Sequence, residues 1–244
     1  MSFTERTAIV YGEAAMKHLA QSSVAIFGLG GVGAAAAVDL IRCGVGRLIV
    51  TDFDTVQESN LNRLVFGFSD TVGKEKVTVL REVAKRINQN AIIEGTTTFL
   101  RGDDAAAHIP AADCYLDAID ALNPKVNLVA ALLASGKPFI SAFGTAGRRD
   151  PTRLAIADVW KTRGCPLAYL VRKRLRKRGV AGHFPAIFST ERPVDPVENP
   201  TATDDGRGRI RKIQGSTPFV PQTAGHIAAW WIVEHLLKTA PGKL

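Results

Sequence analysis

Residues 24–33 read VAIFGLGGVG, and this stretch decides the fold. Four apolar residues typical of a buried strand run directly into a glycine-rich turn, and the apolar residues 34–41 then predict a helix. Glycines at such a turn let a phosphate approach the backbone amides at the start of the helix. We therefore expect a nucleotide site at the glycines of this turn, which are Gly28, Gly30, Gly31 and Gly33.

Alternating strand and helix patterns continue along the first half of the chain. A second apolar run ends at Asp52, 24 residues after Gly28, where a carboxylate suits the hydroxyls of a nucleotide ribose. Further strands are predicted at 91–98, 113–117 and 138–142, and helices at 5–20 and from about Gly73. This alternation predicts an α/β fold with a Rossmann-like, doubly wound, mostly parallel sheet.

After about residue 150 the pattern changes to a C-terminal extension of the same domain. Its predicted elements are a strand at 153–159, a basic helix at 166–178 and an apolar terminal helix at 221–238. The basic helix should bury an apolar stripe made of Leu167, Leu170, Val171 and Leu175. A segment rich in Pro, Gly and Asp, about 192–214, predicts a mobile crossover loop. We assign 1–150 to nucleotide binding and 151–244 to substrate binding and dimerisation.

The charge of the chain is concentrated in one segment. The 244 residues include 31 Lys and Arg against 23 Asp and Glu, a net charge of +8. Residues 161–212 hold 13 basic and 5 acidic side chains, so this segment carries the whole excess. An anionic partner is therefore expected there. With 46% hydrophobic and 22% charged residues, the composition excludes global disorder.

The cysteines and the apolar segments exclude several other classes of protein. Cys43, Cys114 and Cys165 are widely spaced and form no CxxC pair, so neither a structural zinc site nor a disulfide framework is expected. The N-terminus lacks the apolar core of a signal peptide. The most apolar stretch, 224–237, is too short and too polar to span a membrane. We expect a soluble, cytoplasmic protein.

Four residues beyond the glycine turn favour ATP over a dinucleotide. Asn60 and Arg63 follow Asp52, and Lys76 begins a predicted helix. A triphosphate carries more charge than a dinucleotide and is usually held by Arg or Lys together with Mg²⁺. Asp120, after a later strand, is the candidate ligand for the metal, and Asp117 at the strand end is the weaker candidate.

These motifs together resemble a known superfamily. The stretches GLGGVG (28–33), TDFDTVQESNLNR (51–63), VGKEK (72–76) and LDAIDA (116–121) are similar to those of the ubiquitin-activating enzymes and the bacterial sulfur-carrier adenylyltransferases. The resemblance covers about residues 5–150 and implies ATP- and Mg²⁺-dependent adenylation of a carboxylate with release of pyrophosphate. The implied roles are phosphate approach at Gly30 and Gly31, ribose binding at Asp52, phosphate binding at Asn60, Arg63 and Lys76, and Mg²⁺ binding at Asp120. The resemblance also implies a homodimer in which Arg6 reaches the partner subunit's phosphates.

The second half narrows the resemblance. The stretches SAFGTAGRRDPTRLAIADVWKTRGCPL (141–167), IFSTE (187–191) and GSTPFVPQTAGHIAA (215–229) are similar to the tRNA threonylcarbamoyladenosine dehydratase branch. That branch activates the carboxylate of threonylcarbamoyladenosine in the anticodon loop with ATP and cyclises it. Cys165 departs from the pattern, since an acidic residue is expected before Pro166.

On this resemblance the basic segment is expected to contact tRNA phosphates. The candidate residues are Arg172, Lys173, Arg176, Lys177, Arg209 and Arg211. No pattern in the sequence identifies a sulfur-transfer partner. Two other functions remain open: an adenylyltransferase for the C-terminal carboxylate of a small sulfur-carrier or ubiquitin-like protein, and a non-catalytic or NAD-dependent Rossmann module. The lack of CxxC pairs disfavours the first, and Arg63, Lys76 and Asp120 disfavour the second.

Overall fold

The computed structural model describes residues 2–97, 107–198 and 212–239. Within them lies a seven-stranded sheet with the order β3-β2-β1-β4-β5-β7-β6. Every neighbouring pair is parallel except β6 and β7, which pair antiparallel at one edge. The strands are β1 (Ser23–Phe27), β2 (Arg47–Thr51), β3 (Ile92–Thr96), β4 (Cys114–Asp117), β5 (Phe139–Ala142), β6 (Leu154–Asp158) and β7 (Pro185–Ser189). The predicted doubly wound, mostly parallel sheet is therefore confirmed.

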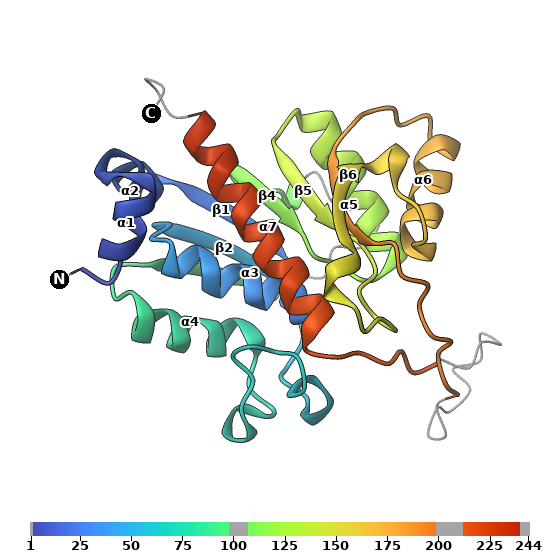
Figure 1. Ribbon diagram of the computed structural model, residues 1–244, viewed down its shortest axis with the longest axis horizontal. Helices are drawn as coiled ribbons and strands as arrows, with labels where there is room; N and C mark the ends of the chain where they lie inside the picture. The colour runs from blue at the N-terminus through green and yellow to red at the C-terminus, as the bar shows by residue number, and fades with distance from the viewer. Residues whose placement is uncertain (1, 98–106, 199–211, 240–244) are drawn as a thin grey trace.

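Helices cover both faces of the sheet (Figure 1). The helices are α1 (Glu5–Tyr11), α2 (Glu13–Gln21), α3 (Gly31–Arg42), α4 (Lys76–Ile87), α5 (Leu122–Ser135), α6 (Pro166–Lys177) and α7 (Phe219–Lys238). One hydrophobic cluster joins α3, α4 and α7 to one face of the sheet, and a second cluster joins α5 and α6 to the other face. Strand β1 supplies both clusters, because its successive side chains point to opposite faces. Val24 and Ile26 belong to the first cluster, and Ala25 and Phe27 to the second.

Helices α3 and α7 cross in close contact. Small residues, Ala34 to Ala37, line the buried part of α3. Gly225 of α7 lies so close that a Cβ there would stand 2.4 Å from the carbonyl oxygen of Val32. The backbones meet because neither helix carries a bulky side chain at the contact, and α7 thereby covers the helix that follows the glycine turn.

The N-terminal helix and one strand differ from the sequence predictions. The single helix expected over 5–20 is two helices, because Gly12 adopts φ 87° and ψ 156° and breaks the helix there. Helix α4 begins at Lys76 rather than near Gly73. Strand β7 was not expected from the sequence, and it lies parallel to β5 and carries the antiparallel edge strand β6.

The buried stripe of α6 is also different from the expected one. Val171 and Leu175 are fully buried as predicted, whereas Leu170 is 39% exposed. Ala168 takes the third buried position on the helix. The stripe shifts because Leu167 and Leu170 line an open cavity, whereas Ala168 between them packs in the core.

Two further expectations concern the end of the chain. Val197 and Ile213 pair antiparallel through N–H···O bonds of 3.1 and 2.8 Å, so the described ends of the predicted 192–214 loop lie side by side. Residues 199–211 lie outside the described part, and the mobility of this loop stays a prediction. Among the described helices, none combines the length and the apolar character needed to cross a membrane.

We predict that Gly225→Ala lowers the free energy of unfolding by about 1–3 kcal/mol, the usual cost of adding a methyl group to a filled contact. The added Cβ would force α3 and α7 apart. Urea unfolding monitored by circular dichroism measures the effect. Gly215→Ala is the control, because a Cβ at Gly215 meets no atom within 4 Å. Equal unfolding midpoints for the two variants would contradict the prediction.

Candidate functional site

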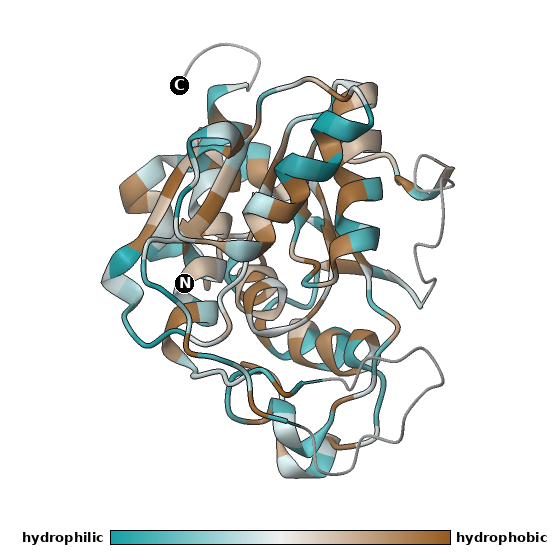
Figure 2. Cartoon of the chain, turned by 90° about the vertical axis from the view of Figure 1, so that its right-hand side faces the viewer, coloured by the Kyte–Doolittle hydropathy of each residue, from teal (hydrophilic) through white to brown (hydrophobic). Residues whose placement is uncertain are grey.

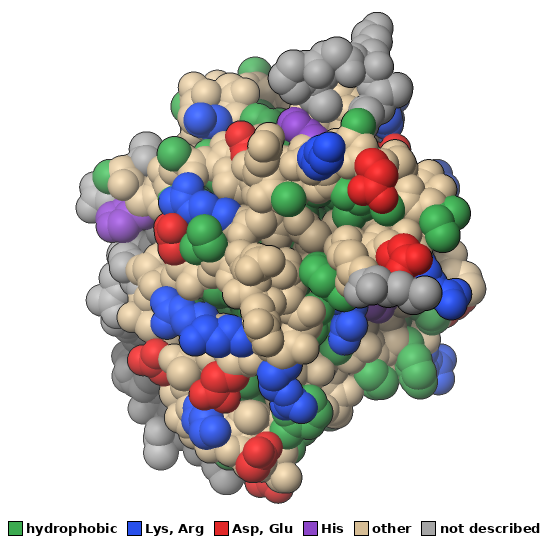
Figure 3. Space-filling model, turned by 90° about the vertical axis from the view of Figure 1, so that its left-hand side faces the viewer, with side chains coloured by type: hydrophobic (Ala, Val, Ile, Leu, Met, Phe, Trp, Pro, Cys, Tyr) green, Lys and Arg blue, Asp and Glu red, His purple; other side chains and the backbone are tan. Residues whose placement is uncertain are grey.

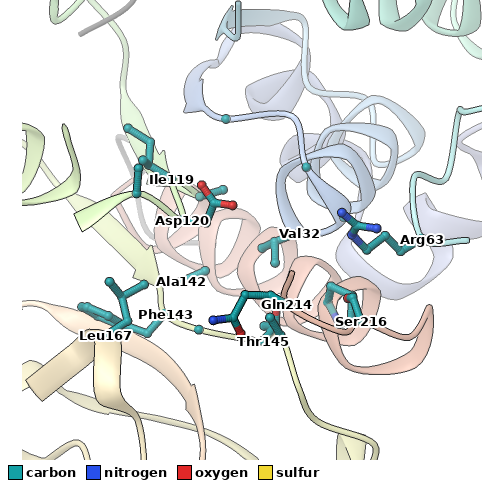
Figure 4. Close-up of a pocket in the computed structure, with 18 of the residues that line it drawn as sticks. Val32, Arg63, Ile119, Asp120, Ala142, Phe143, Thr145, Leu167, Gln214 and Ser216 are labelled. Carbon is teal, nitrogen blue, oxygen red and sulfur yellow. The ribbon is translucent and has the colours of Figure 1, made fainter. Parts of the chain in front are cut away.

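A cavity of about 750 Å³ opens at the carboxyl edge of the sheet (Figure 4). Its walls are the loops that follow β1, β2, β4 and β5 and the first turns of α3, α6 and α7. The cavity lies where the strand order reverses between β1 and β4, the usual ligand position in a doubly wound sheet. The predicted nucleotide residues that line it are Gly28, Gly30, Gly31, Asp52, Asn60, Arg63, Lys76 and Asp120.

The four positions of the turn are occupied by glycine for different structural reasons. Gly28 adopts φ +94°, which L-residues with a side chain rarely do. Gly33 packs beneath the turn rather than at the cavity, since a Cβ there would lie 1.9 Å from the carbonyl oxygen of Gly28. Gly30 and Gly31 face the cavity at the start of α3, and no side chain caps this helix. Its first amides and the positive end of its dipole therefore point at the cavity, a favourable place for an anion.

Asp52 connects the glycine turn to the next strand. Its carboxylate accepts the amide of Leu29 at 2.5 Å and the amide of Asp54 at 2.9 Å, and the Lys76 ammonium stands 3.8 Å away. Lys76 pairs more closely with the Asp54 carboxylate, at 2.9 Å. Burial raises the pKa of Asp52, and this effect outweighs the lowering by Lys76 and by the two amides. A carboxylate and an ammonium thus lie side by side on the floor of the cavity.

Asn60 and Arg63 lie in the loop between β2 and α4. The Arg63 guanidinium donates to the carbonyl oxygen of Ser59 and to Oδ1 of Asn62, both at 2.8 Å. Both acceptors are neutral, and within the described residues Arg63 forms no ion pair. Its positive charge therefore remains available to an anion in the cavity. The loop is held against α7 because Gln222 donates to the carbonyl oxygen of Arg63 at 3.2 Å.

Two aspartates follow β4, and the structure separates their surroundings. Asp117 is fully buried and accepts bonds from Lys125 at 2.7 Å and from Ser141 at 2.6 Å. Asp120 is exposed and lines the cavity, on the opposite side from Arg63 in Figure 4. Asp117 therefore serves the core, and Asp120 is the carboxylate that a bound ion would meet.

The donor set at Asp120 suits Mg²⁺ rather than a tightly caged metal. Within the described ranges, no three His, Cys, Asp or Glu side chains gather as a metal-binding group. Mg²⁺ in nucleotide sites is usually bound by one or two carboxylates, substrate phosphates and retained water. One exposed carboxylate at the cavity wall fits that pattern.

The far half of the cavity differs in chemistry from the glycine half. Phe143, which follows β5, and Leu167 and Leu170 of α6 line it. Val194 lies on the segment after β7 and completes an apolar wall, while Gln214 adds a polar group beside it (Figure 4). One half therefore suits phosphates, and the adjoining half suits a flat or apolar group.

Three charged residues that line this cavity were not predicted as site residues, namely Asp54, Arg148 and Asp195, and Arg148 has the most contacts. Arg148 is only 2% exposed, and its guanidinium donates to the carbonyl oxygens of Glu191 at 3.1 Å, Ala146 at 3.2 Å and Gly164 at 3.4 Å, and to that of Gly144. One side chain thus joins three loops of the apolar wall. The signal in the sequence is the pair of arginines after the glycine at 147. Two of the four acceptors of Arg148, Gly144 and Ala146, are close in sequence, but Gly164 and Glu191 are 16 and 43 residues away, so no local pattern predicts the junction.

Several predicted residues lie outside the cavity of this chain. Arg6 is exposed on α1 and does not line it, and Gly33 lies beneath the turn. Arg172 is half-buried and donates to Thr162 and to the carbonyl oxygen of Val159, so it holds α6 in place. Arg176 stacks over the Trp160 ring at 4.9 Å.

The other predicted RNA-contacting residues fall into two groups. Lys173 and Lys177 are exposed on α6. Arg209 and Arg211 lie outside the described residues, so their placement stays a prediction.

Residues 4–239 match the model of the ThiF family. The chain belongs to this family. It is 34% identical over 238 residues to the tRNA threonylcarbamoyladenosine dehydratase of Bacillus subtilis, covering 96% of this chain and 94% of that protein. The crystal structure of the E. coli tRNA N6-threonylcarbamoyladenosine dehydratase TcdA in complex with ATP is similar with a TM-score of 0.84 and 30% identity, covering 95% of this chain and 92% of that one. The complex of the same enzyme with AMP gives the same TM-score and coverage.

We predict that Arg148→Lys lowers the free energy of unfolding by about 2 kcal/mol or more, because an ammonium cannot reach all the carbonyl oxygens that the guanidinium joins. Urea unfolding measures the change. Arg149→Lys is the matched control, since Arg149 is exposed. The interpretation fails if both variants unfold at the wild-type midpoint.

Proposed function

We propose that this ThiF-family protein is an ATP-dependent dehydratase acting on tRNA. It adenylates the carboxylate of threonylcarbamoyladenosine in the anticodon loop and cyclises the nucleoside, releasing AMP and pyrophosphate. The observation that carries the proposal is the single cavity with a phosphate half and an apolar half side by side, in a chain similar over nearly its full length to dehydratases of this name.

The glycine half is suited to hold ATP. The amides of Gly30 and Gly31 at the start of α3 would meet the phosphates, and Asp52 would accept the ribose hydroxyls. Arg63 and Asn60 would approach the phosphates from the β2–α4 loop. Lys76 would join them by exchanging its pairing with Asp54 for a phosphate oxygen.

Bound Mg²⁺ would be held by Asp120 and the phosphates and would offset their charge during the transfer. The cations of this chain are needed because the substrate carboxylate and the α-phosphate repel each other. Arg63 and Lys76 would reduce that repulsion where the two groups meet. The carboxylate oxygen then bonds to the α-phosphorus, and the bond to pyrophosphate breaks.

The second step takes place against the apolar wall. Phe143, Leu167 and Leu170 would hold the modified base and exclude water from the acyl adenylate. A nucleophilic group of the same nucleoside then attacks the acyl carbon, loses its proton, and AMP leaves. The net change in the nucleoside is the loss of one water, and neither step needs a cysteine or a zinc ion.

A homodimer with Arg6 acting in trans is part of the proposal. Helix α1 buries no residue in its own chain. Its apolar side chains Ile9 and Val10 are 81% and 76% exposed, and Phe3 before it is 51% exposed. Burial of such side chains against a second copy would be favourable and would bring Arg6 to an interface.

The test is conversion of tRNA that carries linear threonylcarbamoyladenosine. We expect purified protein with ATP and Mg²⁺ to yield the cyclic nucleoside, detected by mass analysis after digestion. Asp120→Asn should lower turnover at least about 100-fold, since one lost electrostatic contact at a reacting phosphate has effects of that order. Asp70→Asn is the matched control, because Asp70 is exposed and does not line the cavity.

Two outcomes would change the proposal. Wild-type turnover of Asp120→Asn at saturating Mg²⁺ would remove Asp120 from the metal role. ATP–pyrophosphate exchange that responds to a small sulfur-carrier protein and not to the tRNA would favour the alternative adenylyltransferase.

We also predict that ATP affinity falls as the pH is lowered, and that the fall occurs at a pH above 3.8, the ordinary pKa of an aspartate. Burial raises the pKa of Asp52, so this carboxylate takes up a proton earlier than a solvent-exposed one and loses its acceptor for the ribose. Calorimetric titration across this range measures the loss. Asp52→Asn should bind ATP more weakly at neutral pH and lack this step, and the difference between the two profiles cancels the protonation of ATP itself. Parallel profiles would show that Asp52 does not bind the ribose in its ionised form.

A further inference from the structure

The α5–α6 face carries a repeated pairing of arginine with asparagine. Arg174 of α6 donates to Oδ1 of Asn123 on α5 at 2.5 Å, and Arg178, just past the end of α6, donates to Oδ1 of Asn127 at 2.7 Å. Each pair is spaced four residues from the other on both segments, so the two arginines stand one turn apart, about 6 Å along the axis. We call these two pairs the Arg–Asn ladder.

The ladder holds its arginines without neutralising them. Asparagine accepts a hydrogen bond but carries no charge. Within the described part of the chain, neither Arg174 nor Arg178 has a carboxylate within ion-pair distance. Both side chains are exposed, so each guanidinium keeps its full charge and further donors for an anion from solvent.

The ladder contrasts with an arginine that is held by a carboxylate elsewhere on the surface. The Arg47 guanidinium on β2, for comparison, is paired with the Glu94 carboxylate at 2.8 Å. On the face that carries α1 and α2, basic and acidic side chains are interspersed (Figure 3). Figure 2 views the molecule from the α6 side and shows hydrophilic residues on the helices nearest the viewer. On this face, the two arginines of the ladder are held by neutral asparagines.

The ladder begins at the edge of the cavity. Asn123 precedes Pro124, which lines the cavity, and Arg174 follows the cavity residue Leu170 by one turn. Arg178 continues the line away from the opening. A polyanion following the two arginines would therefore run toward the apolar half of the cavity.

We propose that the Arg–Asn ladder binds successive backbone phosphates of an RNA and directs the strand into the cavity. The inference rests on the proposed function for the identity of the RNA. Neither Arg174 nor Arg178 was among the residues predicted from the sequence to contact tRNA. Of the predicted arginines on α6, Arg172 is half-buried and donates to Thr162, and Arg176 stacks over the Trp160 ring. The asparagines position the two guanidiniums, which lowers the conformational entropy lost on binding.

The test measures the Kd for tRNA between 50 and 200 mM KCl by fluorescence anisotropy in three variants. Arg174→Gln removes one charge, and its Kd should rise several-fold while the slope of log affinity against log salt falls by about 0.7–0.9. Asn123→Asp keeps the arginine but pairs it with a carboxylate, and it should weaken tRNA binding in the same direction without lowering the thermal midpoint. Arg86→Gln on α4 is the matched control, with an exposed arginine on the other face of the sheet, and should bind tRNA as the wild type does.

The Asn123→Asp variant separates binding from packing. If the ladder only fastens α6 to α5, a carboxylate at 123 preserves the bond and leaves tRNA affinity unchanged. Wild-type Kd and salt slope in both Arg174→Gln and Asn123→Asp would overturn the proposal. ATP affinity should be unchanged in all variants.

Failure of the ladder and failure of the proposed function give different results. If the wild type cyclises the nucleoside and the ladder variants bind tRNA normally, the function stands and the ladder is wrong. If the variants lose tRNA affinity but the wild type forms no cyclic nucleoside, the ladder stands as an RNA site and the reaction is wrong. If the wild type binds no tRNA, both are overturned.

Discussion

The hydrogen bond from the Leu29 amide to the Asp52 carboxylate is the contact on which the site depends. It joins the glycine turn after β1 to the end of β2, and Asp52 also accepts the amide of Asp54. The turn itself is fixed from the other side, because Gly28 approaches the carbonyl of Ala118 after β4. Three neighbouring strands therefore end in one connected set of backbone atoms. The start of α3 and the aspartates that face it are placed by this set rather than by their own loops.

The two halves of the cavity differ in the chemistry of their lining residues. Its glycine half presents amides, the Lys76 ammonium and the Arg63 guanidinium, whereas its far half presents Phe143 and Leu167. A buried arginine, Arg148, fastens the loops of the far half without a carboxylate partner among the described residues. The basic side chains of α6 lie outside both halves. The part of the molecule that would position a substrate is thus physically separate from the part that would react with it.

Local patterns predicted the parts of the fold that local forces determine. The apolar run at 24–27, the glycine turn and Asp52 follow each other in the chain, and the structure places them as expected. The break at Gly12 was missed because apolar periodicity continues across it. Strand β7 was missed because only its pairing with β5 and β6, distant in sequence, makes those five residues a strand.

In the candidate site, too, the residues on local sequence motifs were predictable, whereas the contacts between distant segments were not. Residues on short motifs after strands gathered at the cavity, as parallel strands require. The long-range contacts gave no sequence signal: the Arg148–Glu191 contact, the Arg174–Asn123 pair and the exposure of Leu170 depend on segments tens of residues away. Helical periodicity likewise does not reveal the hydrogen bond from the Arg172 guanidinium to Thr162.

The crossing of α3 and α7 also has a consequence for the order of folding, because the packing of α3 cannot be completed before α7 is present. The helix that starts at the glycine turn packs on Gly225, and Gly31 abuts Pro221, so residues near 30 need residues near 220 to complete their surroundings. Contacts of such long sequence separation slow folding, because a large loop must close before they form. During synthesis the first strand–turn–helix leaves the ribosome long before α7 does, and the apolar face of α3 remains uncovered for that interval. The helix after the glycine turn is thus synthesised early, and its contact with α7 can form only once the C-terminal part of the chain has been made.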